Sequence, residues 1–99
     1  MNFSQSEKDF IQNAEAYKPV LESEKLHIDS EEELKERLSR KEPGKLLDLK
    51  NAVFKGLDLS GWDMTGLDLE HATFDGCVLR GADFSGDMMD HVAFYNNEI

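Results

Sequence analysis

A period of five residues runs without a break through the second half of the chain. Every fifth position is Leu, Phe or Met, and five fits neither the 3.6-residue period of an α-helix nor the two-residue period of a strand. A chain that keeps this period has to turn a corner every five residues, so the sequence predicts a solenoid. The positions are Leu49, Phe54, Leu59, Met64, Leu69, Phe74, Leu79, Phe84, Met89 and Phe94.

Two companion series keep the same period. Gly is the commonest residue two positions after each central one, and Gly tolerates corner backbone angles that other residues resist. Two positions before each central residue lies a second, mostly apolar series, and we expect both apolar series to point inward and form a thin core. This second series is Leu47, Ala52, Leu57, Trp62, Leu67, Ala72, Cys77, Ala82, Asp87 and Val92.

The repeat resembles the pentapeptide-repeat family, whose unit reads loosely A-[DN]-L-x-x. The nearest matches are residues 82–86, 67–71 and 57–61, and the resemblance covers residues 46–96. It implies a mainly β fold, a right-handed quadrilateral β-helix with one pentapeptide per side and four per coil. Ten such units would form about 2.5 coils, a stub only about 12 Å long.

The N-terminal residues 1–44 are expected to form a helical cap on the β-helix of residues 45–99, because an open coil end exposes backbone and core. Ser4 and Ser30 each precede a Glu by three positions, the pattern of a capping box. They predict helices over about 5–17 and 31–41, with a short strand over 26–28 between them. We expect this part to pack over the first coil and not to form a separate domain.

At the other end the repeat decays, because Asp87 occupies an inward position. Two interpretations stay open. In the first, the apolar end is uncapped, which favours contact with a second copy or a partner through Met88, Met89, Phe94 and Tyr95. Alternatively, Asp87 bulges outward and Asn96 and Asn97 close the last turn.

The chain is strongly acidic, with 21 acidic and 11 basic residues and a formal net charge of −10. Residues 56–99 alone carry nine acidic residues against one basic residue, Arg80, a net charge of −8. The single Cys77 at an inward position argues for a reduced thiol and against a disulfide framework. With no long apolar run or leader-like segment, we expect a protein of the bacterial cytoplasm with no membrane contact.

The repeat contains residues that could serve metal binding or acid–base catalysis. A 20-residue coil would stack His71 and His91 beside Glu70 and Asp90, a set that can bind a metal if it converges. Corner residues point outward, so we expect these histidines to replace corner glycines. Paired carboxylates can also perform acid–base catalysis, but no nucleophile arrangement or phosphate-binding loop accompanies them. The prediction is a protein without enzymatic activity, cofactor or metal.

An acidic, stiff rod can present a partner with a surface like that of duplex DNA, and the resemblance implies the same, since some family members are viewed as DNA mimics that protect gyrase. The predicted partner is a DNA-binding protein or complex, reached through its basic surface. Direct binding of nucleic acid is not expected, because the acidic surface repels it. The predicted contact residues are Asp58, Asp63, Asp68, Glu70, Asp75, Asp83 and Asp90.

The short length of the predicted solenoid indicates which kind of DNA-binding target to expect. Gyrase-protecting relatives are longer rods that dimerise through their C-terminal coil, and this solenoid is short even as a homodimer. Small size and negative charge favour phage counter-defence, of the anti-CRISPR or anti-restriction type. Gyrase or topoisomerase protection is one alternative. The other is an interaction module that uses the repeat only as a spacer.

Overall fold

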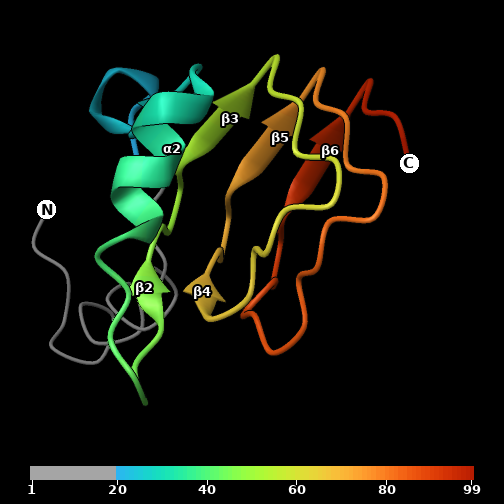
Figure 1. The fold of residues 1–99 in the computed structure, drawn as a ribbon. Coiled ribbons are helices and arrows are strands. Elements are labelled where there is room, and N and C mark those ends of the chain that lie inside the picture. The colour runs from blue at the N-terminus through green and yellow to red at the C-terminus, as the bar shows by residue number, and fades with distance from the viewer. Residues whose placement is uncertain (1–19) are drawn as a thin grey trace, which may run out of the picture.

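The computed structural model describes residues 20–99, which form one helix and a row of short parallel strands beside it (Figure 1). In chain order, the elements run from the cap to the C-terminus. The elements are the 3₁₀ helix η1 (Glu22–Glu24), β1 (His27–Ile28), α2 (Glu31–Leu38), β2 (Leu47–Asp48), β3 (Val53–Lys55), β4 (Leu67–Asp68), β5 (Thr73–Asp75) and β6 (Ala93–Tyr95).

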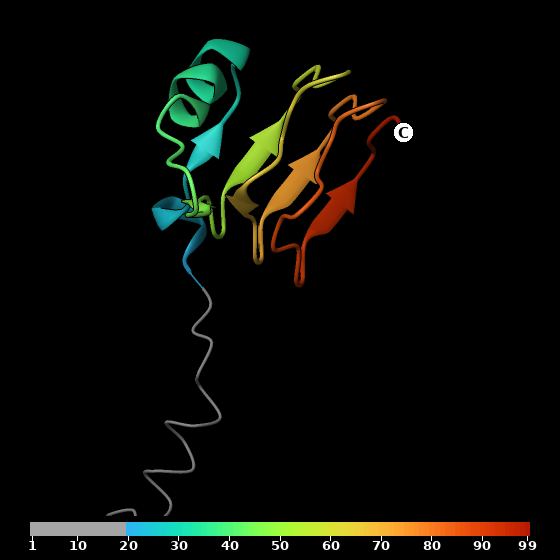
Figure 2. The same ribbon diagram turned by 60° about the horizontal axis from the view of Figure 1, so that its bottom comes forward.

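Strand pairing follows a register of 20 residues, or four five-residue units. Phe54 of β3 pairs with Phe74 of β5, and Phe74 pairs with Phe94 of β6, always in parallel. On another side, β2 pairs with β4 in the same register, Leu47 with Leu67. Figure 2 shows β3, β5 and β6 side by side as successive layers of the chain. The five-residue period therefore produces the predicted β-helix-like solenoid.

The corners of this solenoid share one backbone conformation. Every fifth residue from position 51 to position 96 has a positive φ, between 56° and 75°. Six of these corner residues are Gly, as the repeat predicted, and the other four are Asn51, His71, His91 and Asn96. His71 and His91 thus replace corner glycines, as expected from their place in the repeat.

The two apolar series point inward as predicted, and as far as Leu79 their members are buried except Leu47 and Trp62, which are half-buried. The rings of Phe54 and Phe74 stack with centroids 4.5 Å apart, and those of Phe74 and Phe94 with centroids 5.5 Å apart. Phe54 and Phe74 are fully buried, whereas Phe94, at the end of this ladder, is 46% exposed. The core therefore thins out toward the C-terminus.

The cap joins the solenoid through both a strand and a helix. β1 pairs in parallel with β3, so the strand expected near residues 26–28 extends the solenoid sheet, which runs β1-β3-β5-β6. α2 begins at Ser30, whose Oγ accepts the backbone N–H of Glu33 at 3.1 Å. Leu34 of this helix is fully buried in the same core as the repeat. The other expected helix, over residues 5–17, lies outside the described residues.

α2 is shorter than expected, ending at Leu38 instead of near residue 41. The N–H groups of Arg40 and Lys41 bond to the carbonyls three residues earlier, of Arg37 and Leu38. Such bonds tighten the chain beyond the α-helical path. Pro43 and Gly44 follow, so the chain turns toward β2 before a further helical turn can form.

Phe74 lies at the centre of the aromatic ladder, so its truncation tests the core directly. We expect Phe74→Ala to lower the free energy of unfolding by about 3–5 kcal/mol, because it leaves a cavity between two rings. Phe94→Ala is the matched control, with a smaller loss, since its ring is already half exposed. Equal losses in urea denaturation would contradict this account of the core.

Candidate functional site

Three exposed carboxylates of the repeat are held by the turn that follows them. Oδ1 of Asp58, Asp63 and Asp83 accepts the backbone N–H of the residue two positions on, at 3.1, 3.0 and 2.9 Å. The same oxygen accepts the hydroxyl of that residue at 2.6 Å in each case. These hydrogen bonds favour the charged form and lower the pKa of all three carboxyl groups. The turns thus keep three negative charges in fixed positions.

Asp68 differs from these three. Its side chain is only 13% exposed, and one of its oxygens lies 2.6 Å from Nζ of Lys50, one coil earlier. The hydrogen bond to Asp68 raises the pKa of Lys50. Asp68 is therefore largely neutralised within the chain, which the repeat pattern did not indicate.

The remaining predicted contact residues lie at other corners and sides. Asp90 is exposed, whereas Glu70 and Asp75 are half-buried. Asp75 pairs in register with Lys55 on one side and with Tyr95 on the other. The seven predicted carboxylates therefore do not form one stripe. Among them, only Asp63 and Asp83 are bridged as neighbours in register, one coil apart.

Charge is distributed unevenly along the solenoid. Residues 35–55 contain seven basic and three acidic residues, a net charge of +4, and residues 56–99 have a net charge of −8. The basic part comprises the end of α2, the connection to β2 and the first strands. Residues 20–34, by contrast, carry six acidic residues and one basic residue, so this basic side lies between two acidic parts of the chain.

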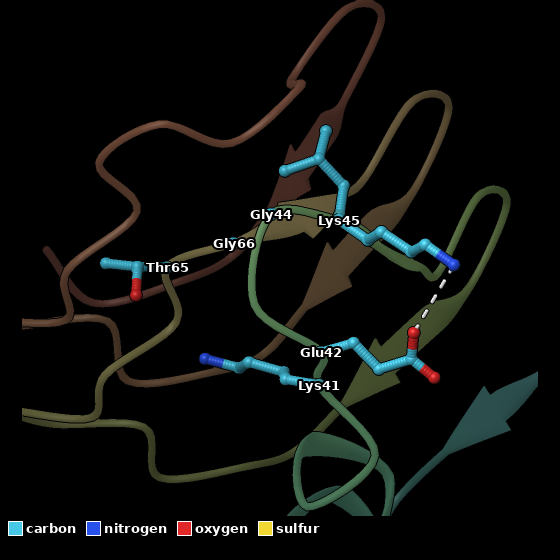
Figure 3. A pocket seen from close by; sticks show the side chains of 7 residues that line it. Lys41, Glu42, Gly44, Lys45, Thr65 and Gly66 are labelled. Carbon is cyan, nitrogen blue, oxygen red and sulfur yellow. Dashed lines mark ion pairs between the residues drawn. The ribbon is translucent and has the colours of Figure 1, made fainter.

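A shallow pocket of about 310 Å³ lies on the basic side, between the connection after α2 and the corner at Gly66 (Figure 3). Its two lysines are engaged: Nζ of Lys45 lies 3.5 Å from Glu42, and Nζ of Lys41 lies 4.0 Å from Asp63. The lining contains no His, Cys or Ser, and the hydroxyl of Thr65 donates to Asp63.

The histidine column predicted by the repeat is present. The rings of His71 and His91 stack with centroids 4.8 Å apart and an interplanar angle of 10°. In the part of the chain that the structure describes, no three His, Cys, Asp or Glu residues are grouped so that they could hold a metal ion.

The C-terminal end combines exposed apolar side chains with polar closure. Met88, Phe94 and Tyr95 are 41%, 46% and 55% exposed, and Met89 packs partly against the core. Asn97 points inward, where its Oδ1 accepts the N–H of Cys77 at 2.7 Å and its Nδ2 donates to the carbonyl of Phe74 at 2.9 Å. The expectation that an Asn closes the last turn is confirmed for Asn97.

Asp87 does not bulge outward, so that interpretation is wrong. Its Oδ1 accepts the N–H of Leu67 at 2.9 Å, while Oδ2 is buried without a hydrogen-bond partner. Burial raises the pKa of Asp87 above its ordinary value. The inward carboxylate satisfies the backbone N–H of Leu67 in the preceding coil. At the equivalent position one coil earlier, the N–H of Leu47 bonds instead to a backbone carbonyl, that of Gly66.

The sequence did contain a signal for the fixed carboxylates. Asp58, Asp63 and Asp83 are each followed two positions later by Ser or Thr, the spacing of a side-chain turn. The Lys50–Asp68 pair depends on the 20-residue register, which places a corner residue beside a strand residue of the next coil.

Residues 48–86 match the family model described as pentapeptide repeats, in eight copies. Together with the 20-residue register, this match shows that the solenoid is built of pentapeptide repeats, as the resemblance implied. No curated protein and no solved structure matches the chain. Within residues 20–99, none of the helices is long and apolar enough to cross a membrane.

The raised pKa of Asp87 makes a pH-dependent prediction. The folded state disfavours its ionised form, so its contribution to stability falls as the pH rises through the raised pKa. Asp87→Asn removes the charge but keeps an oxygen for the N–H of Leu67. We expect the stability of the variant relative to wild type to increase from acid to neutral pH in urea denaturation. A difference that does not vary with pH would contradict the burial of the carboxylate.

Asn97 tests the polar closure separately. Asn97→Ala leaves the N–H of Cys77 and the carbonyl of Phe74 without their partner. We expect a loss of about 1–3 kcal/mol in the free energy of unfolding. Asn96→Ala is not a matched control, because Asn96 has a positive φ; Asn96→Gly is, and it should leave stability nearly unchanged.

Proposed function

We propose that this protein is an acidic DNA mimic that occupies the DNA-binding surface of a bacterial nucleic-acid-binding complex. The observation that carries the proposal is the set of carboxylates at Asp58, Asp63 and Asp83, which are exposed, ionised and fixed by hydrogen bonds. A mimic gains from such preorganisation, because the charges need no ordering when a basic groove binds them. Asp90 adds an exposed carboxylate on the same half of the chain.

The uneven charge favours one orientation in the complex. The C-terminal part, with a net charge of −8 over residues 56–99, would enter the basic groove, and the basic segment of residues 35–55 would face outward. Electrostatic attraction of this kind accelerates association and competes with phosphates for the same Lys and Arg side chains. Asp68 contributes less, since Lys50 already neutralises it.

Phage counter-defence of the anti-CRISPR or anti-restriction type is the biological role that we propose for this activity. The support is a short, acidic solenoid with a helical cap, a shape suited to filling a groove rather than spanning a large enzyme. Gyrase or topoisomerase protection is the alternative target. The protein would act in the bacterial cytoplasm without catalysis, as expected of a binding surface that has no enclosed site.

The finer geometry belongs to the same proposal. We infer a right-handed, four-sided β-helix of about 2.5 coils, since ten five-residue units in a 20-residue register give that number. An experimental structure of the protein checks the handedness.

A second function has one observation in its favour. Met88, Phe94 and Tyr95 are exposed at the C-terminal end, which supports a non-catalytic interaction module that docks end-on and uses the repeat as a spacer. A homodimer through the same end is one form of this. The two functions differ in their dependence on salt, because apolar docking is little affected by ionic strength.

A pull-down from bacterial lysate, followed by mass spectrometry, identifies the target. For the captured complex, we expect the triple change of Asp58, Asp63 and Asp83 to Asn to weaken binding by about tenfold or more at low salt and to reduce its salt dependence. Asn keeps a side-chain oxygen for the turn, so the variant removes charge and preserves the fold. The capture itself should be released by added duplex DNA.

The matched control changes three exposed cap residues, Glu24, Asp29 and Glu32, to their amides. It alters the net charge equally, so only the position of the charges differs between the variants. Equal weakening by both variants, or capture that persists in high salt and in excess duplex, would contradict mimicry.

A further inference from the structure

The four-stranded sheet β1-β3-β5-β6 has two unlike edges. At the first edge, α2 contacts β1 and buries Leu34 completely. At the other edge, none of the elements in residues 20–99 covers β6, which pairs only with β5 (Figure 1). An uncovered strand edge offers backbone groups to another chain unless the protein blocks it.

On two other sides of the C-terminal coil, residues 80–99, side chains bond to the coil below. Asp87 accepts the N–H of Leu67, and Asn97 bonds to the N–H of Cys77 and the carbonyl of Phe74. Asp87 and Asn97 occupy positions that are apolar in the coils below, Leu67 and Cys77. Stacking a complete further coil on this end would bury an unpaired carboxylate, which is costly.

On the β6 side, backbone hydrogen bonds join successive coils. In the preceding coils, the N–H of Gly56 and of Gly76 bonds to the carbonyl of the next coil, and the carbonyls of Ala52 and Ala72 accept an N–H from it. The equivalent groups on the last coil are the N–H of Asn96 and the carbonyl of Val92. Within residues 20–99, neither group has a partner in the hydrogen-bond pattern of the solenoid. The edge can therefore pair with one more strand.

The aromatic ladder supports a specific contact on the same strand. One face of the Phe94 ring stacks on Phe74, and the ring remains 46% exposed. Beside it, Tyr95 is 55% exposed. A partner side chain above Phe94 would continue the ladder of Phe54 and Phe74 by one step.

The negative charge of the C-terminal coil favours one kind of chain beside β6. Residues 80–99 carry four acidic residues and one basic residue, a net charge of −3, so two copies meeting at this end would repel each other. Arg80 already holds Glu98, with Nη2 and Oε2 2.7 Å apart. Asp90, three residues before β6, is exposed and has no ion pair among the described residues. A basic strand complements this end, and a second copy does not.

We propose that β6 is a docking edge for one extended strand of a partner protein, with an apolar or aromatic side chain above Phe94 and a Lys or Arg beside Asp90. Backbone pairing supplies the orientation, and the side-chain contacts supply the preference for sequence. This site goes beyond the mimicry of DNA, because it needs a strand and not only a basic groove.

The test is an NMR titration of the ¹⁵N-labelled full chain with a short capped peptide that carries Lys at both ends and Val-Phe-Val at its centre. We expect saturable amide shifts concentrated in residues 92–96. Phe94→Ser should weaken binding about fivefold, from the loss of an aromatic pair. Phe94→Leu should retain more affinity, and Asp90→Asn should weaken binding whereas the exposed cap change Glu32→Gln should not.

A version of the peptide with alternate backbone nitrogens methylated keeps its charge and side chains but cannot pair with a strand. Equal binding of both peptides would overturn the proposal, and so would shifts centred on Asp63 and Asp83, which would indicate charge attraction alone. Self-association detected by sedimentation and abolished by Phe94→Ser would assign the edge to a second copy and also overturn it. None of these results depends on the target of the mimic, so this proposal and the proposed function fail separately.

Discussion

The left-handed backbone conformation at every fifth residue is the constraint on which the structure depends. All corners from position 51 to position 96 have a positive φ, a region that costs an L-residue roughly 1–2 kcal/mol and Gly almost nothing. Because the corners recur at this spacing, the chain returns to the same side after 20 residues and its strands pair in parallel. These corners set the positions of the core residues, of the stacked aromatic and histidine rings, and of the surface charges.

The same constraint explains how surface charge becomes fixed. Asp58, Asp63 and Asp83 each lie where an oxygen reaches the N–H two positions on, so the turn that shapes the coil also orders the carboxylate. A chain with an equal net charge but no repeat would hold these groups far less rigidly. However, the corners also distribute the acids over several sides, so among the seven predicted contact residues only Asp63 and Asp83 form a bridge across coils.

The two ends of the solenoid meet the problem of an exposed core differently. The N-terminal end is covered by β1 and α2, whose Leu34 enters the core of the repeat. In the C-terminal coil, Asp87 and Asn97 instead accept N–H groups of the coil below, from Leu67 and Cys77. These bonds do not cover the end itself, where Phe94 remains half exposed. The asymmetry leaves one end of the molecule suited to contact.

The sequence by itself determined the solenoid, its inward residues and its corners, because a five-residue period has few solutions and Gly marks where the chain turns. It also placed His71 and His91 at corners and predicted a short strand and a helix before the repeat. Only the tertiary structure decided that Asp87 points inward, that Lys50 neutralises Asp68, and that β1 joins the sheet. These facts depend on which residues meet across coils or beyond the repeat, where burial and pairing, not local pattern, set the free energy.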